Sequence, residues 1–223
     1  MIPKILHYIH FGGEETLSDF RKTICLPSIY KYCTDWEIKI WNEHNLDMEM
    51  NNWVKQAYEN KQYNYLSDYF RIFLLYKYGG VYIDTDVEII RPIDDLLCNK
   101  GFCGIQQDQI YFNYFNKNLK KICIKYVDYH PIIALGLIIG CEPGDNYIKQ
   151  ILDNFSNYKN CNSDPLMVYP NKLFHKDGFV FENKLQIIND WVIYPAEYFC
   201  PIPCGSDKLN KTVNTYTIHH YGK

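Results

Sequence analysis

The sequence predicts an α/β protein whose first half forms a largely parallel sheet. Two observations lead to this fold class. Strand-like and helix-like segments alternate along roughly the first hundred residues, as they do where helices connect parallel strands. The later residues carry short strands in a less regular order, which indicates a mixed sheet. The chain has 223 residues, 47% of them hydrophobic and 22% charged, so we expect one soluble domain over residues 1–223.

The first half begins with a strand, Ile2–Ile9, that runs into a turn containing Gly12 and Gly13. Ligands bind to α/β sheets at turns of this kind. Spacing and alternation then predict the elements that follow, in chain order: a helix over Leu17–Tyr32, a strand over Trp36–Trp41, a helix over Asn51–Asn60, a helix over Ser67–Tyr78, a strand over Val81–Ile83, extended chain over Val87–Ile90 and a short helix after Pro92.

The segment from Ser67 to Asp86 is the most informative part of the chain. Apolar and aromatic residues recur every three to four positions up to Tyr78, as on one face of a helix. Asp68 and Arg71 lie three residues apart and therefore share a face near the start of that helix. Gly79 and Gly80 fit a C-cap and turn, and a short β-branched and aromatic strand follows them.

Asp84 and Asp86 end this unit. Side chains alternate along an extended chain, so the two carboxylates are expected to point to the same side. Two carboxylates on one side favour a bound cation, and oxygen ligands favour Mn²⁺ or Mg²⁺. The pattern indicates a cation clamp that also holds phosphate.

The second half is expected to contain strands and one further helix. The expected strands are Phe102–Ile105, Ile132–Ile139, Leu185–Ile188, Val192–Tyr194 and a closing segment over Thr215–Tyr221, and the expected helix is Gly144–Phe155.

Composition excludes several classes of protein. The net charge of −3 and the lack of a dense Lys/Arg block argue against nucleic-acid binding. No apolar run reaches transmembrane length, although peripheral contact with a membrane stays open. The N-terminal residues lack a signal-peptide pattern, and the nine cysteines contain no CxxC pair, so we expect a cytoplasmic protein with reduced thiols.

Several motifs together resemble glycosyltransferase family 32, the DXD sugar-transferase family, which includes yeast-type mannosyltransferases, bacterial capsular polysaccharide transferases and, in its core, the glucosyltransferase domain of clostridial toxins. The similarity runs nearly from end to end. The motifs that carry it are Ile2–Ile9, Trp41-Asn42-Glu43, Ser67-Asp68-Tyr69-Phe70-Arg71, Leu75–Asp86 with its LYxxGGxYxDxD pattern, and Tyr194–Phe199.

This resemblance implies a GT-A fold, a Rossmann-like mixed sheet flanked by helices, as a single domain. It also implies Mn²⁺ or Mg²⁺, a nucleotide-sugar donor and retention of the anomeric configuration. A UDP-sugar is favoured over GDP-mannose, and the acceptor would be a glycan, a lipid-linked or a protein hydroxyl group. No residue stands out as a nucleophile, so front-face attack by the acceptor is the expected route.

The resemblance also carries over individual roles. Asp68 and Arg71 would contact the donor sugar or phosphate and act in catalysis together with Asp86. Thr85 lies between the two carboxylates, and Ile9 would border the donor.

At two places the sequence departs from the family. His10 stands where relatives often have a Trp that stacks on the base. Relatives also tend to continue past the closing His with Ser-Trp, whereas this sequence has Gly222-Lys223.

The third metal ligand would come from the closing segment. Only one of His219 and His220 faces the site in extended chain, and period two does not say which. The family places its closing His at His219, which we expect to join Asp84 and Asp86.

Two other functions remain open from the sequence. A haloacid-dehalogenase-like phosphatase also has Asp-x-Asp after an apolar strand, but its motif requires Thr or Val where this chain has Glu88. The other is a module that binds a nucleotide-sugar or glycan without turnover.

Overall fold

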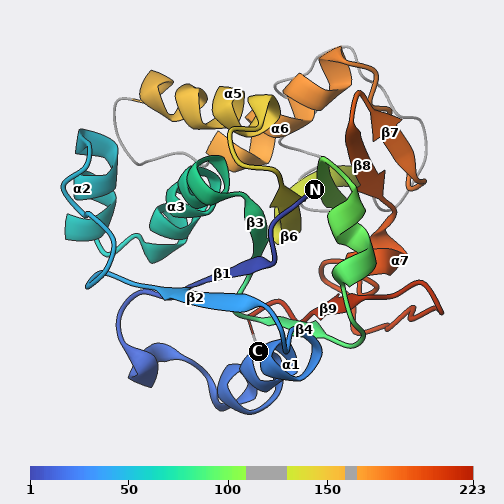
Figure 1. The fold of residues 1–223 in the computed structure, drawn as a ribbon, viewed down its shortest axis with the longest axis horizontal. Helices are drawn as coiled ribbons and strands as arrows, with labels where there is room; N and C mark the ends of the chain where they lie inside the picture. Colours follow the sequence, from blue (N-terminus) through green and yellow to red (C-terminus); the bar gives the residue numbers. More distant parts are fainter. Residues whose placement is uncertain (109–129, 159–164, 223) are drawn as a thin grey trace.

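The computed structural model describes residues 1–108, 130–158 and 165–222 (Figure 1). Its centre is a seven-stranded sheet with the order β2-β1-β3-β6-β5-β8-β7. The strands are β1 (Ile5–Ile9), β2 (Glu37–Trp41), β3 (Gly80–Ile83), β5 (Gly101–Asp108), β6 (His130–Cys141), β7 (Gln186–Ile188) and β8 (Trp191–Tyr194). Strand β1 pairs in parallel with β2 and β3, whereas β6 is antiparallel to β3 and β5. A parallel first half within a mixed sheet is therefore confirmed.

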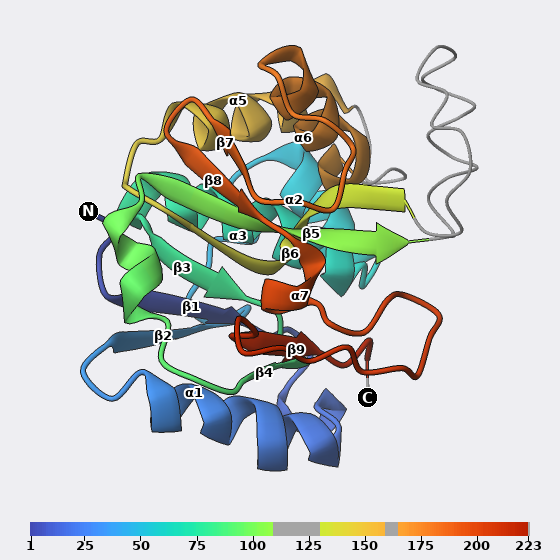
Figure 2. The same ribbon diagram turned by 90° about the vertical axis from the view of Figure 1, so that its right-hand side faces the viewer.

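Helices cover both faces of this sheet (Figures 1 and 2). Helices α2 (Asn52–Glu59), α3 (Tyr63–Tyr78), α5 (Asn146–Asn154) and α6 (Pro165–Lys176) lie on one face, and α1 (Leu26–Tyr32) lies on the other. A short helix, α7 (Ala196–Phe199), follows β8. Short helical turns complete the described elements: η1 (Glu14–Thr16), η2 (Arg21–Cys25), η3 (Asp94–Cys98) and η4 (Phe155–Asn157). This is the Rossmann-like mixed sheet flanked by helices expected for a GT-A fold.

Strand β3 separates two hydrophobic cores because its side chains alternate between the faces. Tyr82 packs with Phe70 and Leu74 of α3 on one face. Val81 and Ile83 pack on the other with residues of the α1 layer. Each fully buried apolar side chain of this size contributes about 1.5–3 kcal/mol to folding. Burial on both faces therefore fixes the strand that leads to Asp84.

A two-stranded antiparallel sheet lies beside α1, formed by β4 (Val87–Ile89) and β9 (Thr217–His219). In this pair Val87 lies opposite His219. The ladder joins the segment after Asp86 to the last part of the described chain. It thereby brings Asp86 and His219, which are far apart in the sequence, to one place.

Several boundaries differ from the sequence predictions. Helix α3 begins at Tyr63, one turn before Ser67, so Asp68 lies inside the helix rather than at its first turn. The segment predicted as one helix from Leu17 contains the π-helical turn η2 before α1.

Helix α6 was not predicted. Pro170 lies inside it, and proline disrupts helical hydrogen bonding. A tertiary contact supports the helix, because the Asn171 amide pairs with the backbone N–H and C=O of Ile133, at 2.8 and 3.0 Å.

Two further observations concern the chain as described. No helix within residues 1–108, 130–158 and 165–222 combines the length and the apolarity needed to cross a membrane. No disulfide joins the cysteines in these ranges. They are Cys25, Cys33, Cys98, Cys103, Cys141, Cys200 and Cys204.

Candidate active site

A cavity of about 470 Å³ lies where the end of β3 meets α3, β6 and the C-terminal segment. A volume of this size suits a small organic ligand. Its lining includes Ile9, Arg21, Asn64, Ser67, Asp68, Arg71, Tyr82, Asp84, Thr85, Asp86, Gln106, Ile132, Ile133, Ala134, Leu135, Gly136, Leu137, Leu166, Cys204, His219 and Tyr221. Polar side chains gather along one part of this lining, and β6 supplies a mostly apolar part.

We call Asp68, Arg71, Tyr82 and Asp84 the Asp84 group. The Arg71 Nη2 atom lies 2.9 Å from Asp68 Oδ1 and 3.1 Å from Asp84 Oδ1. The Tyr82 hydroxyl donates to Asp84 Oδ1 at 2.6 Å, and the guanidinium of Arg71 lies 4.6 Å from the centre of the Tyr82 ring. The helix spacing predicted from the sequence therefore places Asp68 and Arg71 together, facing Asp84.

Burial raises the pKa of Asp84, and the neighbouring Arg71 guanidinium acts in the opposite direction. The Asp84 group also lies directly against the backbone of β6. A Cβ atom added to Gly136 would lie 2.8 Å from both Arg71 Nη1 and Asp84 Oδ2. Glycine at this position is therefore what lets the ion pair approach the strand.

A shift in the pairing register between β5 and β6 lets this part of β6 line the cavity. The register between β5 and β6 jumps from the pair Cys103–Ile139 to the pair Gly104–Ala134. The β6 residues between these pairs include Gly136 and contribute to the cavity lining. Bulged strands of this kind often lie next to active sites because they redirect the chain.

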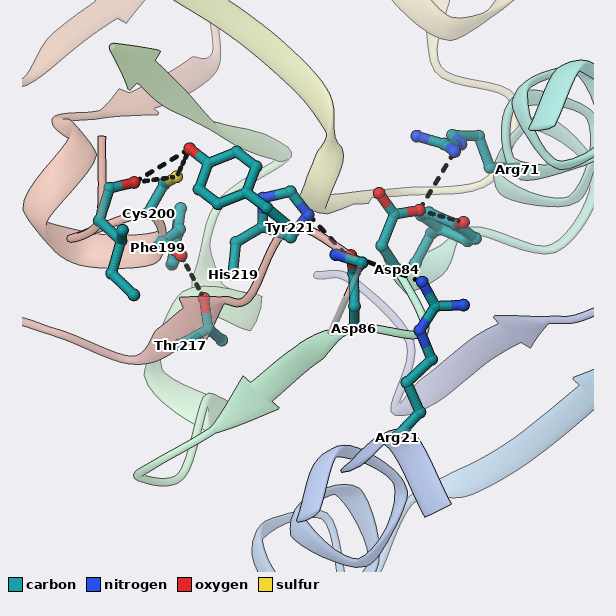
Figure 3. A network of polar contacts seen from close by, with 12 residues as sticks. Arg21, Arg71, Asp84, Asp86, Phe199, Cys200, Thr217, His219 and Tyr221 are labelled. Atoms are coloured by element: carbon teal, nitrogen blue, oxygen red, sulfur yellow. Dashed lines mark hydrogen bonds and ion pairs between the residues drawn. The ribbon is translucent and has the colours of Figure 1, made fainter. Parts of the chain in front are cut away.

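We call Asp86, His219, Arg21 and Gly222 the Asp86 group, and Figure 3 labels the first three of them. The His219 Nε2 atom lies 3.3 Å from Asp86 Oδ1. On the other carboxylate oxygen, the Gly222 N–H donates at 2.6 Å, and Arg21 Nη2 lies 3.9 Å away. In Figure 3, Arg21 and Arg71 approach the two carboxylates from different sides.

These contacts change the pKa of both members of the Asp86–His219 pair. Burial raises the pKa of Asp86, but the hydrogen bond and charge of His219, the Gly222 N–H and Arg21 outweigh it and lower that pKa to about 2. Burial lowers the pKa of His219, whereas Asp86 and Cys200 raise it to about 10. Without a cation the two side chains therefore form an ion pair; to bind a cation, His219 would have to lose this proton, which a bound divalent cation favours.

Asp84, Asp86 and His219 each offer one ligand atom, and these three atoms all lie within 4.8 Å of one another. Two carboxylates and an imidazole form a donor set that Mn²⁺ accepts. The residues present therefore fit a divalent cation, which Asp84, Asp86 and His219 would hold.

The structure brings most of the predicted site residues to this one cavity: Ile9, Asp68, Arg71, Asp84, Thr85, Asp86 and His219. His220 faces away, with its Nε2 3.0 Å from Glu88 Oε2. His10 is not part of the cavity lining. Its Nε2 lies 2.8 Å from Thr16 Oγ1 and 2.9 Å from the Gly13 carbonyl. Its role at the base stays a prediction.

Sequence reasoning missed Arg21, Gln106, Cys204 and Tyr221, which also line the cavity. Arg21 carried no signal beyond its place in a helical segment. Tyr221 lay inside the closing segment, but nothing in the sequence showed which of its residues turns inward.

Residues 20–103 match the family described as "Glycosyltransferase sugar-binding region containing DXD motif". Two mannosyltransferases of Schizosaccharomyces pombe are similar over part of the chain. Inositol phosphoceramide mannosyltransferase 1 is 34% identical over 71 residues, or 30% of this chain and 22% of that protein. Inositol phosphoceramide mannosyltransferase 3 is 36% identical over 67 residues, or 28% of this chain and 19% of that protein. The chain thus spans about a fifth of the length of these relatives.

An uncharacterized glycosyltransferase of Acanthamoeba polyphaga mimivirus is similar over a longer range, with 24% identity over 93% of this chain and 76% of that protein. Solved structures resemble the chain at low identity. Galactosyltransferase LgtC, with donor and acceptor sugar analogs, has 13% identity and a TM-score of 0.48, covering 98% of this chain and 87% of LgtC. A glycosyltransferase involved in glycosylation of the PBCV-1 major capsid has 11% identity and a TM-score of 0.48, covering 98% and 93%.

Proposed function

We propose that this chain is a metal-dependent glycosyltransferase, because residues 20–103 match the family of glycosyltransferase sugar-binding regions that contain a DXD motif. It would move a sugar from a nucleotide-sugar to a hydroxyl acceptor. One observation carries the proposal. Asp84, Asp86 and His219 converge in the cavity that Asp68 and Arg71 also line, although His219 is distant from the others in sequence.

The chemistry follows from where charge develops. Breaking the bond between the anomeric carbon and the diphosphate leaves negative charge on the phosphate and positive charge on the sugar ring. A divalent cation held by Asp84, Asp86 and His219 would supply positive charge at the leaving phosphate. Arg71 is held in place by Asp68 and Asp84, so its guanidinium needs little reorganisation to orient the donor. The Asp68 carboxylate would accept hydrogen bonds from sugar hydroxyls.

We propose that the reaction retains the anomeric configuration through attack on the front face. The acceptor oxygen bonds to the anomeric carbon on the side from which the diphosphate departs. The carbon–oxygen bond to the diphosphate breaks, and the acceptor proton passes to the departing phosphate oxygen. The described cavity lining supports this route: its carboxylates are Asp68, Asp84 and Asp86, and each is already engaged by Arg71 or His219.

The donor is proposed to be a UDP-sugar, with GDP-mannose as the second choice. The acceptor would be a glycan, a lipid-linked or a protein hydroxyl. The names of the fission-yeast relatives pair a mannosyl group with inositol phosphoceramide, which supports including GDP-mannose and a lipid acceptor in any screen.

A thermal-shift screen of UDP- and GDP-sugars, with and without Mn²⁺, tests the proposal, because a ligand that binds only the folded state raises the melting temperature. The expected result is a rise with one nucleotide-sugar that requires Mn²⁺, together with slow hydrolysis of that donor. Release of inorganic phosphate from monoesters would instead indicate a phosphatase. Stable binding without any hydrolysis or transfer would indicate a binding module.

A further inference from the structure

The cavity is lined by two arginines whose partners differ greatly. Arg71 is 6% exposed and forms ion pairs with Asp68 and Asp84. Arg21 has one long contact, 3.9 Å from its Nη2 atom to Asp86 Oδ2, which exceeds ordinary hydrogen-bond length. Its Nε is buried and has no hydrogen-bond partner among the described residues. Arg21 therefore retains hydrogen-bond donors that no described residue uses.

Asp86 does not depend on Arg21 for its hydrogen bonds. The Gly222 N–H donates to Oδ2 at 2.6 Å, and His219 lies 3.3 Å from Oδ1. A guanidinium that served only to neutralise Asp86 would be expected at hydrogen-bond distance, as Arg71 is from Asp68. The longer separation leaves Arg21 placed beside the carboxylate and facing the cavity.

The backbone that carries Arg21 is firmly attached to the site. Arg21 is the first residue of η2, a π-helical turn, and such turns occur frequently at functional sites. The helix that follows is tied to β4, because the Ser28 hydroxyl accepts a hydrogen bond from the Ile89 N–H at 2.9 Å. Strand β4 begins at Val87, directly after Asp86. The position of Arg21 relative to Asp86 is thus set by the fold.

An arginine with unused donors at the rim of a polar cavity is suited to an anion. Its planar guanidinium matches the oxygens of a phosphate group, to which it can donate two parallel hydrogen bonds. A nucleotide-sugar brings a diphosphate to the same carboxylates if they hold a cation. The 22% exposure of the Arg21 side chain leaves part of it accessible from the cavity.

We propose that Arg21 binds a non-bridging oxygen of the donor diphosphate. This inference rests on the proposed function, and it adds a donor-binding residue outside the motifs that suggested that function. Arg21 would hold the diphosphate from the side opposite Arg71 and would stay bound to it as negative charge grows on the leaving group.

The test compares ligands that do and do not carry a diphosphate. Binding of Mn²⁺ alone, Mn²⁺–pyrophosphate, UDP, GDP and uridine would be measured by calorimetry for the wild type, Arg21→Gln and Arg21→Lys. Lys22→Gln is the matched control, because Lys22 is the exposed next residue of the same turn. Charge-assisted hydrogen bonds support an expected loss of about 10- to 100-fold in affinity for pyrophosphate and diphosphates in Arg21→Gln.

Uridine and Mn²⁺ alone should bind Arg21→Gln about as well as they bind the wild type, and Arg21→Lys should recover part of the lost affinity. Equal binding of pyrophosphate by wild type and Arg21→Gln would overturn the inference about Arg21. The proposed glycosyltransferase function would still stand if the wild type hydrolyses the donor. A matching loss of Mn²⁺ affinity would also overturn it, because Arg21 would then only shape Asp86. A wild type that binds no diphosphate at all would overturn both proposals.

Discussion

The Asp84 group and the Asp86 group lie next to each other but are built in different ways. Asp68, Arg71, Tyr82 and Asp84 come from one helix and the strand that follows it. The partners of Asp86 come from a turn before α1 and from the segment around β9. The pKa values of the two carboxyl groups are shifted in opposite directions. Burial raises the pKa of Asp84, whereas the partners of Asp86 lower the pKa of Asp86 to about 2.

This difference shows which contacts each group depends on. The side-chain contacts within the Asp84 group join residues of α3, of β3 and of the position directly after β3, which are close in sequence. The Asp86 group requires the pairing of β4 with β9, which joins residues far apart in the chain. We therefore expect changes at the Asp84 group to act mainly on chemistry, and changes at the Asp86 group to act also on docking of the C-terminal segment.

The largest effect is expected from removing either carboxylate. Asp84→Asn and Asp86→Asn should each lower donor turnover by roughly 1,000-fold, because the site loses charge that holds the cation at the leaving group. Donor hydrolysis and Mn²⁺ affinity would be measured in metal-depleted protein to which Mn²⁺ is returned. Glu88→Gln is the control, since Glu88 pairs with His220 outside the cavity lining. Normal turnover in either Asn variant would show that the substituted carboxylate does not hold the cation.

Next in size is the effect of Asp68→Asn. This change should weaken binding of the intact nucleotide-sugar by about 10- to 100-fold, because the carboxylate is proposed to accept hydrogen bonds from sugar hydroxyls. Binding of the free nucleoside diphosphate should change much less. Calorimetry with both ligands on the same variant provides the internal control. Equal losses for the two ligands would mean that Asp68 serves only to hold Arg71, with which it forms an ion pair.

The buried His7 contacts Gly79, directly before strand β3, and its burial predicts that the stability of the protein depends on pH. His7 Nε2 lies 2.8 Å from the Gly79 carbonyl, and its Nδ1 accepts from Trp41 Nε1 at 3.1 Å. Burial lowers the pKa of His7 to about 4. As the pH falls, the histidine of the unfolded chain, with a pKa near 6.5, binds a proton before His7 of the folded protein does. The contribution of neutral, buried His7 to the free energy of unfolding is therefore complete above about pH 6.5 and is lost as the pH falls toward 4.

The expected loss in free energy of unfolding is about 2 kcal/mol between pH 6.5 and 5. Urea unfolding of the wild type and of His7→Gln across this range would measure it, and the variant should show a flatter profile. Identical pH profiles would assign the slope to other groups.

A smaller effect is expected from Gly136→Ala. The new Cβ would meet Arg71 Nη1 and Asp84 Oδ2 at 2.8 Å, so the ion pair must move. Donor hydrolysis should fall roughly tenfold because Arg71 and Asp84 are displaced, about 1.4 kcal/mol in the barrier, and the free energy of unfolding should fall by about 1–3 kcal/mol, as is typical of overpacking. Gly178→Ala is the control: its φ of +112° strains a side chain, but a Cβ there meets nothing within 4 Å. That variant should melt earlier and keep its activity. Full activity of Gly136→Ala would show that the Asp84 group tolerates displacement.

The same contrast explains what the sequence could predict. Asp68 and Arg71 were predicted because the helix period fixes their shared face, and Asp84 because it directly follows the glycine turn and the strand. The expected extended chain from Asp84 to Asp86 was wrong: β3 ends at Ile83, and Thr85 and Asp86 lie in a turn, so strand alternation is not what brings the two carboxylates together. His219 was placed only through family resemblance. Arg21 and the Gly222 N–H could not be predicted, because their contact with Asp86 depends on tertiary docking.

The elements of the fold also differ in how well the sequence predicts them. The first strands and helices follow clear periodicity, but α6 does not, since Pro170 interrupts its pattern and a contact with β6 sustains it. Local sequence rules carry no information on such contacts.

The smallest expected effect concerns His10, at the end of β1. Hydrogen-bond contacts with Thr16 and the Gly13 carbonyl hold its imidazole near the glycine turn. If the donor base lies there, His10→Trp should bind nucleoside diphosphate about fivefold more tightly, or about 1 kcal/mol, because an indole covers more of a base. His10→Ala should bind it more weakly. Affinity and melting temperature would be measured together, with Thr16→Val as the control for loss of the hydrogen bond alone. An early-melting Trp variant without tighter binding would show that the Trp side chain overpacks this position and that the base is held elsewhere than at His10.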